Sequence, residues 1–249
     1  MNIITEVVSP NYSTRANPIK FIIIHYTALK FEDAVDRLCD PLSKVSSHYI
    51  IKSDGQIFEL VNPINVAWHA GVSYWKGLSK INEYSIGIEL DNLGCEPYSL
   101  EQMDSCISLC KMLISKYNIP NENILGHSDI AVDRKIDPGI FFDWQLLAKR
   151  NLGICRKTKV ANPSNRLMFK FGDHGVEVLK LQRKLSNIGY QIELSSIFDL
   201  QTNYVIRSFQ SHFNPEAIEK LGVDFYQDPD SIYQWDKISD IILSSIVDI

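Results

Sequence analysis

The sequence predicts an α/β domain, in which a β-sheet is flanked by helices, followed by a small all-α domain of three helices. Two observations predict this fold. Up to residue 152, short apolar segments of strand length alternate with segments of helical periodicity. Beyond residue 160, the periodicity is helical. We therefore divide the chain into residues 1–159 and residues 160–249.

The first domain opens with a strand, a helix and a hairpin. Residues 21–25 form an apolar run rich in β-branched side chains, which is typical of a strand buried on both faces. Residues 31–42 have helical spacing. Two further strands, at residues 48–51 and 56–61, flank the Asp54-Gly55 pair, and Asp-Gly between apolar runs indicates a β-hairpin.

The middle of the first domain continues this alternation. Residues 85–90 alternate in polarity, so that one face of the expected strand is apolar and the other presents Glu89. A helix is expected over residues 99–117, with Ser99 as its N-cap. Another short strand is expected at residues 124–127, and a helix over residues 142–152 completes the domain.

A linker separates the two domains. A cluster of basic residues lies within residues 149–159, and the turn-forming residues 162–165 follow it. Beyond this point, three segments carry apolar side chains at helical spacing and predict three helices. They are residues 178–185, 206–213 and 238–247. Residues 214–234 are expected to be an extended connection.

The composition describes a globular protein that does not bind nucleic acid. Of 249 residues, 25 are Lys or Arg and 30 are Asp or Glu, and the net charge of −5 is unfavourable for binding phosphates. No apolar run approaches the ~20 residues that cross a bilayer. Residues 1–20 contain no secretory signal, so the sequence by itself predicts a cytoplasmic protein. Five cysteines without a Cys-x-x-Cys pair are typical of a reducing compartment.

Three side chains of the first domain suit a metal ion. His25 and His127 each end an expected strand, and both imidazoles would leave the sheet at one edge if these strands are neighbours. Asp137 follows ten residues after His127. Two imidazoles and one carboxylate leave a fourth tetrahedral position for water, which is the pattern of catalytic Zn²⁺ sites. The alternative is that each histidine is a hydrogen-bonded structural residue, which the spacing alone favours.

Six sequence blocks resemble, in order, the zinc-dependent N-acetylmuramoyl-L-alanine amidases of the type 2 family. The resemblance covers roughly residues 18–150 and implies a mixed β-sheet flanked by helices. It also implies hydrolysis of the amide between the lactyl group of N-acetylmuramic acid, in its ordinary or 1,6-anhydro form, and L-alanine of the peptidoglycan stem peptide. The blocks are FIIIHYT (21–27), SHYII (47–51) with Asp54-Gly55, AWHAG (67–71), SIGIEL (85–90), Gly126-His127 and KIDPG (135–139).

The resemblance also assigns roles. It implies Zn²⁺ ligands at His25, His127 and Asp137, a catalytic acid/base at Glu89 and an oxyanion-stabilising lysine at Lys135. These roles suit the reaction, because an amide needs a polarised carbonyl, an activated water and a protonated leaving nitrogen. The alternatives are that Glu89 is a solvent-facing strand residue and Lys135 an ordinary surface ion.

Two departures place the chain within the family. Some members, the phage type especially, have a tyrosine where this sequence has Ser47, whereas another line of the family uses the strand glutamate that is present here as Glu89. Asp137 stands where the phage and recognition-protein branches have a cysteine ligand. The combination resembles the bacterial amidases of cell-wall recycling and turnover, so Glu89 rather than a tyrosine is expected to be the base.

Aromatic side chains gather in a glycine-containing stretch between the hairpin and the strand of Glu89. Aromatic faces suit sugar rings and a peptide stem in a groove, so we expect these residues to bind substrate. The alternative is loop packing, with Trp68 in the core. The four candidates are Trp68, His69, Tyr74 and Trp75. His48 is expected to be structural, whereas His174 and His212 are expected on the surface.

The second domain resembles the three-helix peptidoglycan-binding module of cell-wall hydrolases over roughly residues 166–246. The blocks that carry this resemblance include Gly172-Asp173-His174-Gly175 and Phe198-Asp199. Tethering to the wall would raise the local substrate concentration. Relatives with this layout work outside the cytoplasm, which makes the periplasm or cell envelope the alternative compartment. A helical appendage that only packs on the first domain is the alternative role.

Two other functions are consistent with these blocks. One is a non-catalytic peptidoglycan recognition protein, which would keep the groove without a complete metal site. The other is an amidase for a different acyl-amino-acid amide, with the second domain as a partner-binding module. The sequence makes no prediction about oligomeric state.

Overall fold

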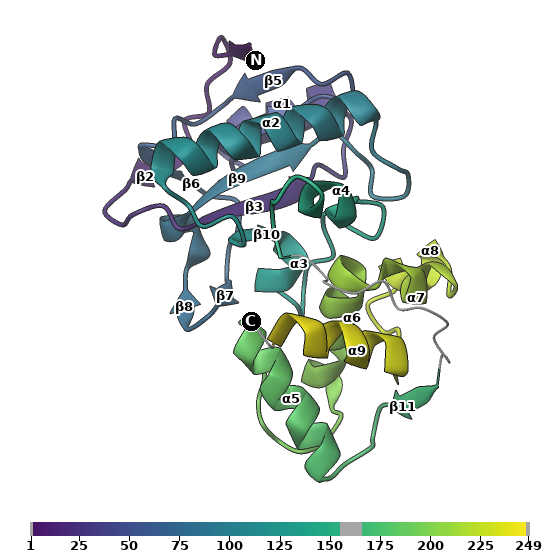
Figure 1. Ribbon diagram of the computed structural model, residues 1–249. Helices are drawn as coiled ribbons and strands as arrows, with labels where there is room; N and C mark the ends of the chain where they lie inside the picture. Colours follow the sequence, from purple (N-terminus) through teal and green to yellow (C-terminus); the bar gives the residue numbers. More distant parts are fainter. Residues whose placement is uncertain (1, 155–165, 248–249) are drawn as a thin grey trace.

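The computed structural model describes residues 2–154 and 166–247 (Figure 1). The first domain is built on a six-stranded sheet in the order β1-β5-β4-β9-β3-β10. The strands are β1 (Ile3–Ile4), β3 (Phe21–Tyr26), β4 (Tyr49–Ile51), β5 (Ile57–Glu59), β9 (Ser85–Leu90) and β10 (Ile124–Gly126). Strands β4, β9, β3 and β10 run parallel, whereas β5 is antiparallel to β4. The predicted mixed sheet and the predicted hairpin are confirmed.

The register of the central strands brings three predicted site residues to one edge of the sheet. Strand β3 lies between β9 and β10, so the expected strand neighbours are neighbours in space. His25 is directly opposite Glu89, and Ile24 is opposite Gly126, which precedes His127. The carboxyl ends of three parallel strands therefore place His25, Glu89 and His127 at the same edge of the sheet.

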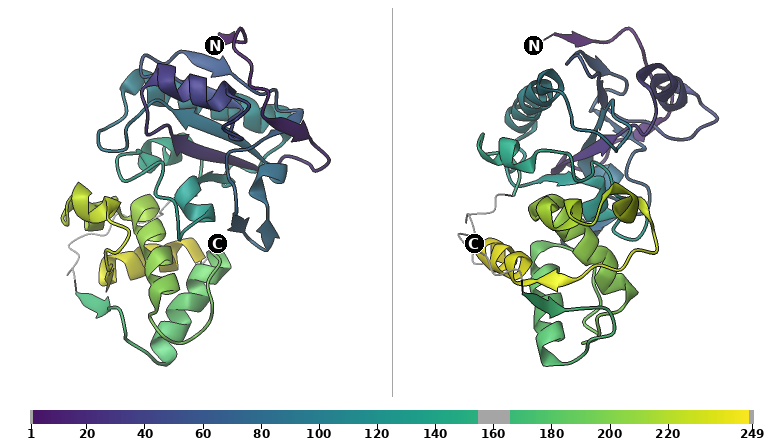
Figure 2. Two further views of the ribbon diagram at one scale, coloured as in Figure 1. Left: turned by 180° about the vertical axis from the view of Figure 1, so that it is seen from behind. Right: turned by 90° about the vertical axis from the view of Figure 1, so that its right-hand side faces the viewer.

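Helices cover both faces of the sheet, as the right-hand view of Figure 2 shows. Helix α2 (Leu100–Tyr117) packs on one face, where buried side chains such as Cys106, Cys110 and Leu113 meet Ile22 and Ile24. Its N-cap is Ser99, whose hydroxyl accepts a hydrogen bond from the Gln102 N–H, as the sequence predicted. Helix α1 (Phe31–Cys39) packs on the opposite face.

Short elements complete the first domain. They include two antiparallel pairs, a 3₁₀ helix and two short helices. These are β2 (Tyr12–Thr14) with β6 (Asn65–Ala67), β7 (Tyr74–Trp75) with β8 (Leu78–Ser79), the 3₁₀ helix Ile81–Tyr84, α3 (His127–Ile130) and α4 (Trp144–Ala148).

The second domain is built around the three predicted helices, with additions. Helices α5 (Val176–Ile188), α6 (Leu200–Phe213) and α9 (Lys237–Val247) form its core. The extended connection expected over residues 214–234 is wrong in part, because it contains the short helices α7 (Pro215–Glu219) and α8 (Val223–Gln227). The expectation of helices alone is also incomplete, since β11 (Leu167–Phe169) pairs with β12 (Trp235–Asp236).

The two domains share one apolar core. Phe21 and Leu125 of the sheet belong to the same buried cluster as Leu185, Tyr190 and Phe209 of the second domain. Figures 1 and 2 show the second domain lying beyond the β10 edge of the sheet. The predicted boundary at residue 160 lies outside the described residues. Within the described ranges, no helix has the length and apolar character needed to cross a membrane.

Candidate metal centre and active site

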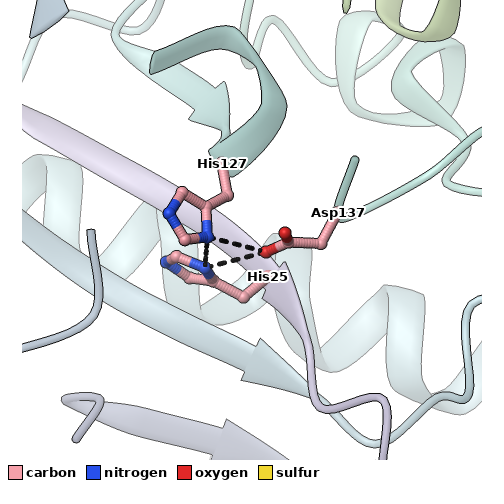
Figure 3. Close-up of side chains that lie close together, drawn as sticks. All are labelled: His25, His127 and Asp137. Atoms are coloured by element: carbon pink, nitrogen blue, oxygen red, sulfur yellow. Dashed lines mark hydrogen bonds and ion pairs between the residues drawn. The ribbon is translucent and has the colours of Figure 1, made fainter. Parts of the chain in front are cut away.

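His25, His127 and Asp137 point toward one another at the edge of the sheet (Figure 3). The two Nδ1 atoms are 2.9 Å apart, and Asp137 Oδ2 lies 3.0 Å from each of them. All three side chains are buried. In the described part of the chain, these residues form the one cluster of three or more His, Cys, Asp or Glu whose ligand atoms could hold a metal ion. The structure therefore brings together the three predicted ligands.

The chain positions these ligands with short connections. His25 lies near the end of β3, and His127 begins α3 directly after β10. The Ser128 N–H donates to the Asp137 carbonyl oxygen at 2.9 Å, which ties the two later ligand positions together through the backbone. Gly126 stands where a Cβ would be 2.7 Å from Pro138, so a side chain there would push this turn away from Asp137.

Hydrogen bonds determine which nitrogen of His127 carries the proton. Nε2 of His127 lies 3.2 Å from the carbonyl oxygen of Ala70, which can only accept. The Nε2–H therefore donates to Ala70, and the lone pair on Nδ1 faces the other two ligands. A metal-binding histidine with its second nitrogen held by a carbonyl is the usual arrangement in proteins.

A longer chain of hydrogen bonds determines which nitrogen of His25 carries the proton. The Ser85 hydroxyl donates to the Ile81 carbonyl at 2.7 Å, so its oxygen accepts from His69 Nε2 at 3.2 Å. His69 Nδ1 is then an acceptor for His25 Nε2–H at 3.0 Å. This leaves the lone pair of His25 Nδ1 directed at the cluster.

His69 fits this chain because β9 has a glycine beside it. A Cβ at Gly87 would lie only 2.5 Å from the His69 ring, too close for any real side chain. The Ser-Ile-Gly sequence of β9 thus supplies both the hydroxyl that holds His69 and the space for its ring. His69, which was predicted to bind substrate, is also a hydrogen-bond partner of His25.

The charge states of the cluster suit a cation. Burial, together with the neighbouring His127, lowers the pKa of His25 to about 4, so its imidazole is neutral at neutral pH. Burial alone would raise the pKa of Asp137, but His127 and His25 lower it overall, so the carboxylate is ionised. Two nitrogen lone pairs and a carboxylate oxygen therefore converge, an arrangement that a divalent metal ion neutralises and that these groups cannot satisfy among themselves.

Glu89 and Lys135 line the same cavity as the three ligands, which has a volume of about 480 Å³. Glu89 Oε2 is buried and has no hydrogen-bond partner among the described residues. Burial raises the pKa of Glu89 well above its ordinary value, the charge of Asp137 raises it further, and Lys135 opposes both. A carboxyl group with a raised pKa beside the ligands is suited to proton transfer.

The predicted substrate residues divide into two groups. Trp68 and His69 line the cavity of the metal cluster, but Tyr74 and Trp75 do not. Trp75 is 1% exposed and packs edge-on against Tyr190 of the second domain, with ring centroids 5.0 Å apart. Tyr74 lines a separate cavity of about 470 Å³ between α3 and the second domain. Binding of substrate by these four residues stays a prediction.

Four other polar residues can be compared with the predictions from the sequence. Arg37 and Arg134 line the cavity of the metal cluster and were not predicted as site residues. Arg134 could have been suggested by its neighbour Lys135, whereas no sequence motif pointed to Arg37. Arg134 Nη2 donates to the Ala70 carbonyl at 2.5 Å. His48 is structural as expected, since its Nδ1 accepts from the Gly87 N–H at 3.0 Å. The expectation that His212 lies on the surface is wrong, because it is buried against Asp129.

Comparisons with known proteins identify the family. Residues 15–140 match the N-acetylmuramoyl-L-alanine amidase family, and residues 174–217 match a peptidoglycan binding domain. This chain belongs to the N-acetylmuramoyl-L-alanine amidase family. The predictions of an amidase fold and of an enzyme that hydrolyses the N-acetylmuramoyl-L-alanine amide are confirmed by this membership and by the relatives named below.

Individual relatives match either most of this chain or about half of it. The amidase AmiD of Escherichia coli K12 is 35% identical over 213 residues, which cover 79% of this chain and 75% of that protein. The 1,6-anhydro-N-acetylmuramyl-L-alanine amidase AmpD of Haemophilus influenzae is 35% identical over 161 residues, or 56% of this chain and 88% of that protein.

Solved structures agree. The E. coli AmiD complex with anhydro-N-acetylmuramic acid-L-Ala-D-gamma-Glu-L-Lys has a TM-score of 0.75 at 29% identity and covers 95% of this chain and 92% of that one. AmpDh3 of Pseudomonas aeruginosa has a TM-score of 0.69 at 26% identity, covering 96% of each chain. The compartment, the domain boundary and the roles of individual site residues stay predictions.

Proposed function

We propose that this amidase depends on Zn²⁺ held by His25, His127 and Asp137, and that it acts on muropeptides, including those that end in 1,6-anhydro-N-acetylmuramic acid. The observation that supports the metal is the convergence of two imidazole lone pairs on one carboxylate oxygen, at 2.9–3.0 Å. Nitrogen and oxygen donors in this number suit Zn²⁺, whereas Mg²⁺ and Ca²⁺ bind chiefly to oxygen. The substrates of the relatives support the choice of muropeptide.

The metal supplies Lewis-acid chemistry: when bound, Zn²⁺ polarises an amide carbonyl and lowers the pKa of water. The rest of the reaction falls to side chains of the chain. Glu89 lies across from His25 on β9, with Oε2 buried beside the cluster. In its ionised form it accepts a proton from the attacking water, and the same carboxyl then donates this proton to the leaving nitrogen of L-alanine.

Lys135 supplies the positive charge. It lines the cavity two residues before Asp137. The charge of its ammonium group lowers the pKa of Glu89 and the pKa of His25. An ammonium group at this place stabilises the negative charge that develops on the amide oxygen. Trp68 lines the same cavity and offers an aromatic face to the sugar or stem peptide.

The test is a digestion of defined substrates. Purified enzyme is incubated with anhydro-muropeptide and with insoluble wall sacculi, and mass spectrometry follows the release of peptide that begins with L-alanine. We expect release from anhydro-muropeptide, loss of release after treatment with a chelator, and recovery when Zn²⁺ is returned. Equal release by metal-stripped enzyme would refute the role of Zn²⁺. A separate sedimentation assay on the same sacculi measures whether the second domain holds the protein on the wall.

A further inference from the structure

Side chains of the second domain form hydrogen bonds to the segment that carries two of the three proposed metal ligands. We call residues 127–137 the ligand segment. Asp129, two residues after His127, is 1% exposed and receives four groups around its carboxylate. They are the Gly126 N–H at 2.8 Å, the Tyr190 hydroxyl at 2.8 Å, His212 Nδ1 at 2.8 Å and the Ser208 hydroxyl at 3.2 Å. Three of these four groups belong to the second domain.

Further contacts reach the backbone of the same segment. Each comes from a side chain of the second domain and ends on a carbonyl oxygen of the ligand segment. They are Ser208 Oγ to Ser128 at 2.9 Å, Arg207 Nη2 to Val132 at 2.7 Å and the Tyr226 hydroxyl to Ile136 at 2.7 Å. The contacts lie along the whole segment, and the last one is on the residue next to Asp137.

The groups that make these contacts are themselves held firmly. The His212 imidazole is stacked between Trp144 of the first domain and Phe213, with ring centroids 3.7 Å and 4.0 Å away. Tyr190 packs against Trp75 of the first domain. Both domains therefore fix the rings that bind Asp129, so that a shift of the carboxylate would require the interface to repack.

We infer that the second domain is part of the scaffold of the metal site, with Asp129 and Tyr226 as positioning residues for His127 and Asp137. Asp129 holds the turn before His127 through Gly126, and Tyr226 holds the backbone before Asp137. The Ser128–Asp137 backbone bond makes the two ligands move together. Outer partners of metal ligands contribute about 10–100-fold to metal affinity. This inference rests on the proposed function, because it concerns affinity for Zn²⁺.

The experiment compares Zn²⁺ dissociation constants of full-length variants, measured by competition with a chromophoric chelator at one pH. Tyr226→Phe removes the hydroxyl that donates to the Ile136 carbonyl of the ligand segment. Asp129→Asn removes the negative charge that His212 faces. The matched control is Tyr233→Phe, because the Tyr233 hydroxyl bonds within the second domain, to the Tyr226 carbonyl at 3.4 Å. Denaturant unfolding of each metal-free variant and the visible spectrum of each cobalt(II)-loaded variant are recorded in parallel.

We expect Zn²⁺ to bind about 10–100-fold more weakly to Asp129→Asn and several-fold more weakly to Tyr226→Phe, with altered cobalt spectra and no change for Tyr233→Phe. Interface variants that bind Zn²⁺ as tightly as the control, with the wild-type spectrum, would overturn this inference while leaving the proposed function intact, even if their stability falls. A wild-type protein that binds no Zn²⁺ would overturn the proposed function, and this inference with it.

Discussion

Two buried carboxylates of the ligand segment, Asp129 and Asp137, have histidine neighbours but opposite surroundings. Three donors face Asp129, namely the Gly126 N–H, the Tyr190 hydroxyl and His212 Nδ1, and the Ser208 hydroxyl lies 3.2 Å from it while also bonding to the Ser128 carbonyl at 2.9 Å. Asp137 instead faces the Nδ1 atoms of His25 and His127, whose protons are committed elsewhere through Nε2. The first carboxylate is satisfied by the protein alone, and the second is not.

The difference shows how a metal site can be distinguished from a structural ion pair. Distances do not separate them, since both sets of contacts lie between 2.8 and 3.2 Å. The far side of each histidine does. Nε2 of His25 and Nε2 of His127 each have a hydrogen-bond acceptor, which leaves their Nδ1 lone pairs facing Asp137, whereas Nε2 of His212 has no such acceptor among the described residues and its Nδ1 carries the proton toward Asp129.

The largest effect is expected from Asp137→Asn. This change keeps the shape of the side chain and removes the negative charge between the two imidazoles, so bound Zn²⁺ and activity should both be lost. Elemental analysis of the purified variant measures the metal. Asp133→Asn is the matched control, because Asp133 is exposed in the same segment and undergoes the same change of charge. Equal zinc in both variants would remove Asp137 from the ligands.

Glu89→Gln is expected to separate metal binding from catalysis. Glu89 is half-buried, with its Oε2 atom buried near Asp137, but it lies outside the trio of ligand atoms, so Zn²⁺ should remain bound. An amide cannot carry the proton, and kcat should fall by about 10²–10⁴. Steady-state kinetics on anhydro-muropeptide, together with zinc content, measure both quantities. Full activity in this variant would show that another group moves the proton.

A smaller loss is expected from Lys135→Met. The substitution keeps much of the side-chain volume and removes the ammonium group, so kcat should fall by about 10²–10³ while KM changes little. Lys149→Met, at the exposed end of α4, provides the control. A change in KM alone would indicate that Lys135 binds substrate rather than the charge that develops during reaction.

The smallest effect concerns pH and His48. Burial and then the charge of Arg15 lower the pKa of His48 to about 3, below its ordinary value of 6.5, so the unfolded chain binds this proton more readily. The free energy of unfolding should therefore fall as the pH decreases from 6.5 toward 3, by on the order of 2 kcal/mol between pH 6.5 and 4.5 from this group. Denaturant unfolding in chelator should give a flatter pH dependence for His48→Gln. An unchanged slope would assign the effect to other groups.

Much of the fold could be predicted because its signals are local. The apolar run of β3, the Asp54-Gly55 turn and the Ser99 cap each determine their own element. The ligands required one more step, namely that β3 and β10 are neighbours, and the ordered sequence blocks supplied it.

Features that depend on contacts between the domains could not be predicted. Trp75 packs edge-on against Tyr190 of the second domain, a contact that no pattern around this loop aromatic residue indicates. His212 was expected on the surface because a single histidine on a helix carries no sign of its partner, Asp129, 83 residues away. Which surface a side chain finds depends on how the two domains dock, and no local pattern records that docking.

The most direct test of the metal centre is a crystal structure of the Zn²⁺-loaded protein with anomalous diffraction at the zinc edge. We expect one peak at roughly 2.0–2.2 Å from Nδ1 of His25, Nδ1 of His127 and an oxygen of Asp137, with Nε2 of His127 still bonded to the Ala70 carbonyl. Zinc bound elsewhere, or bound through the Nε2 atoms, would contradict it.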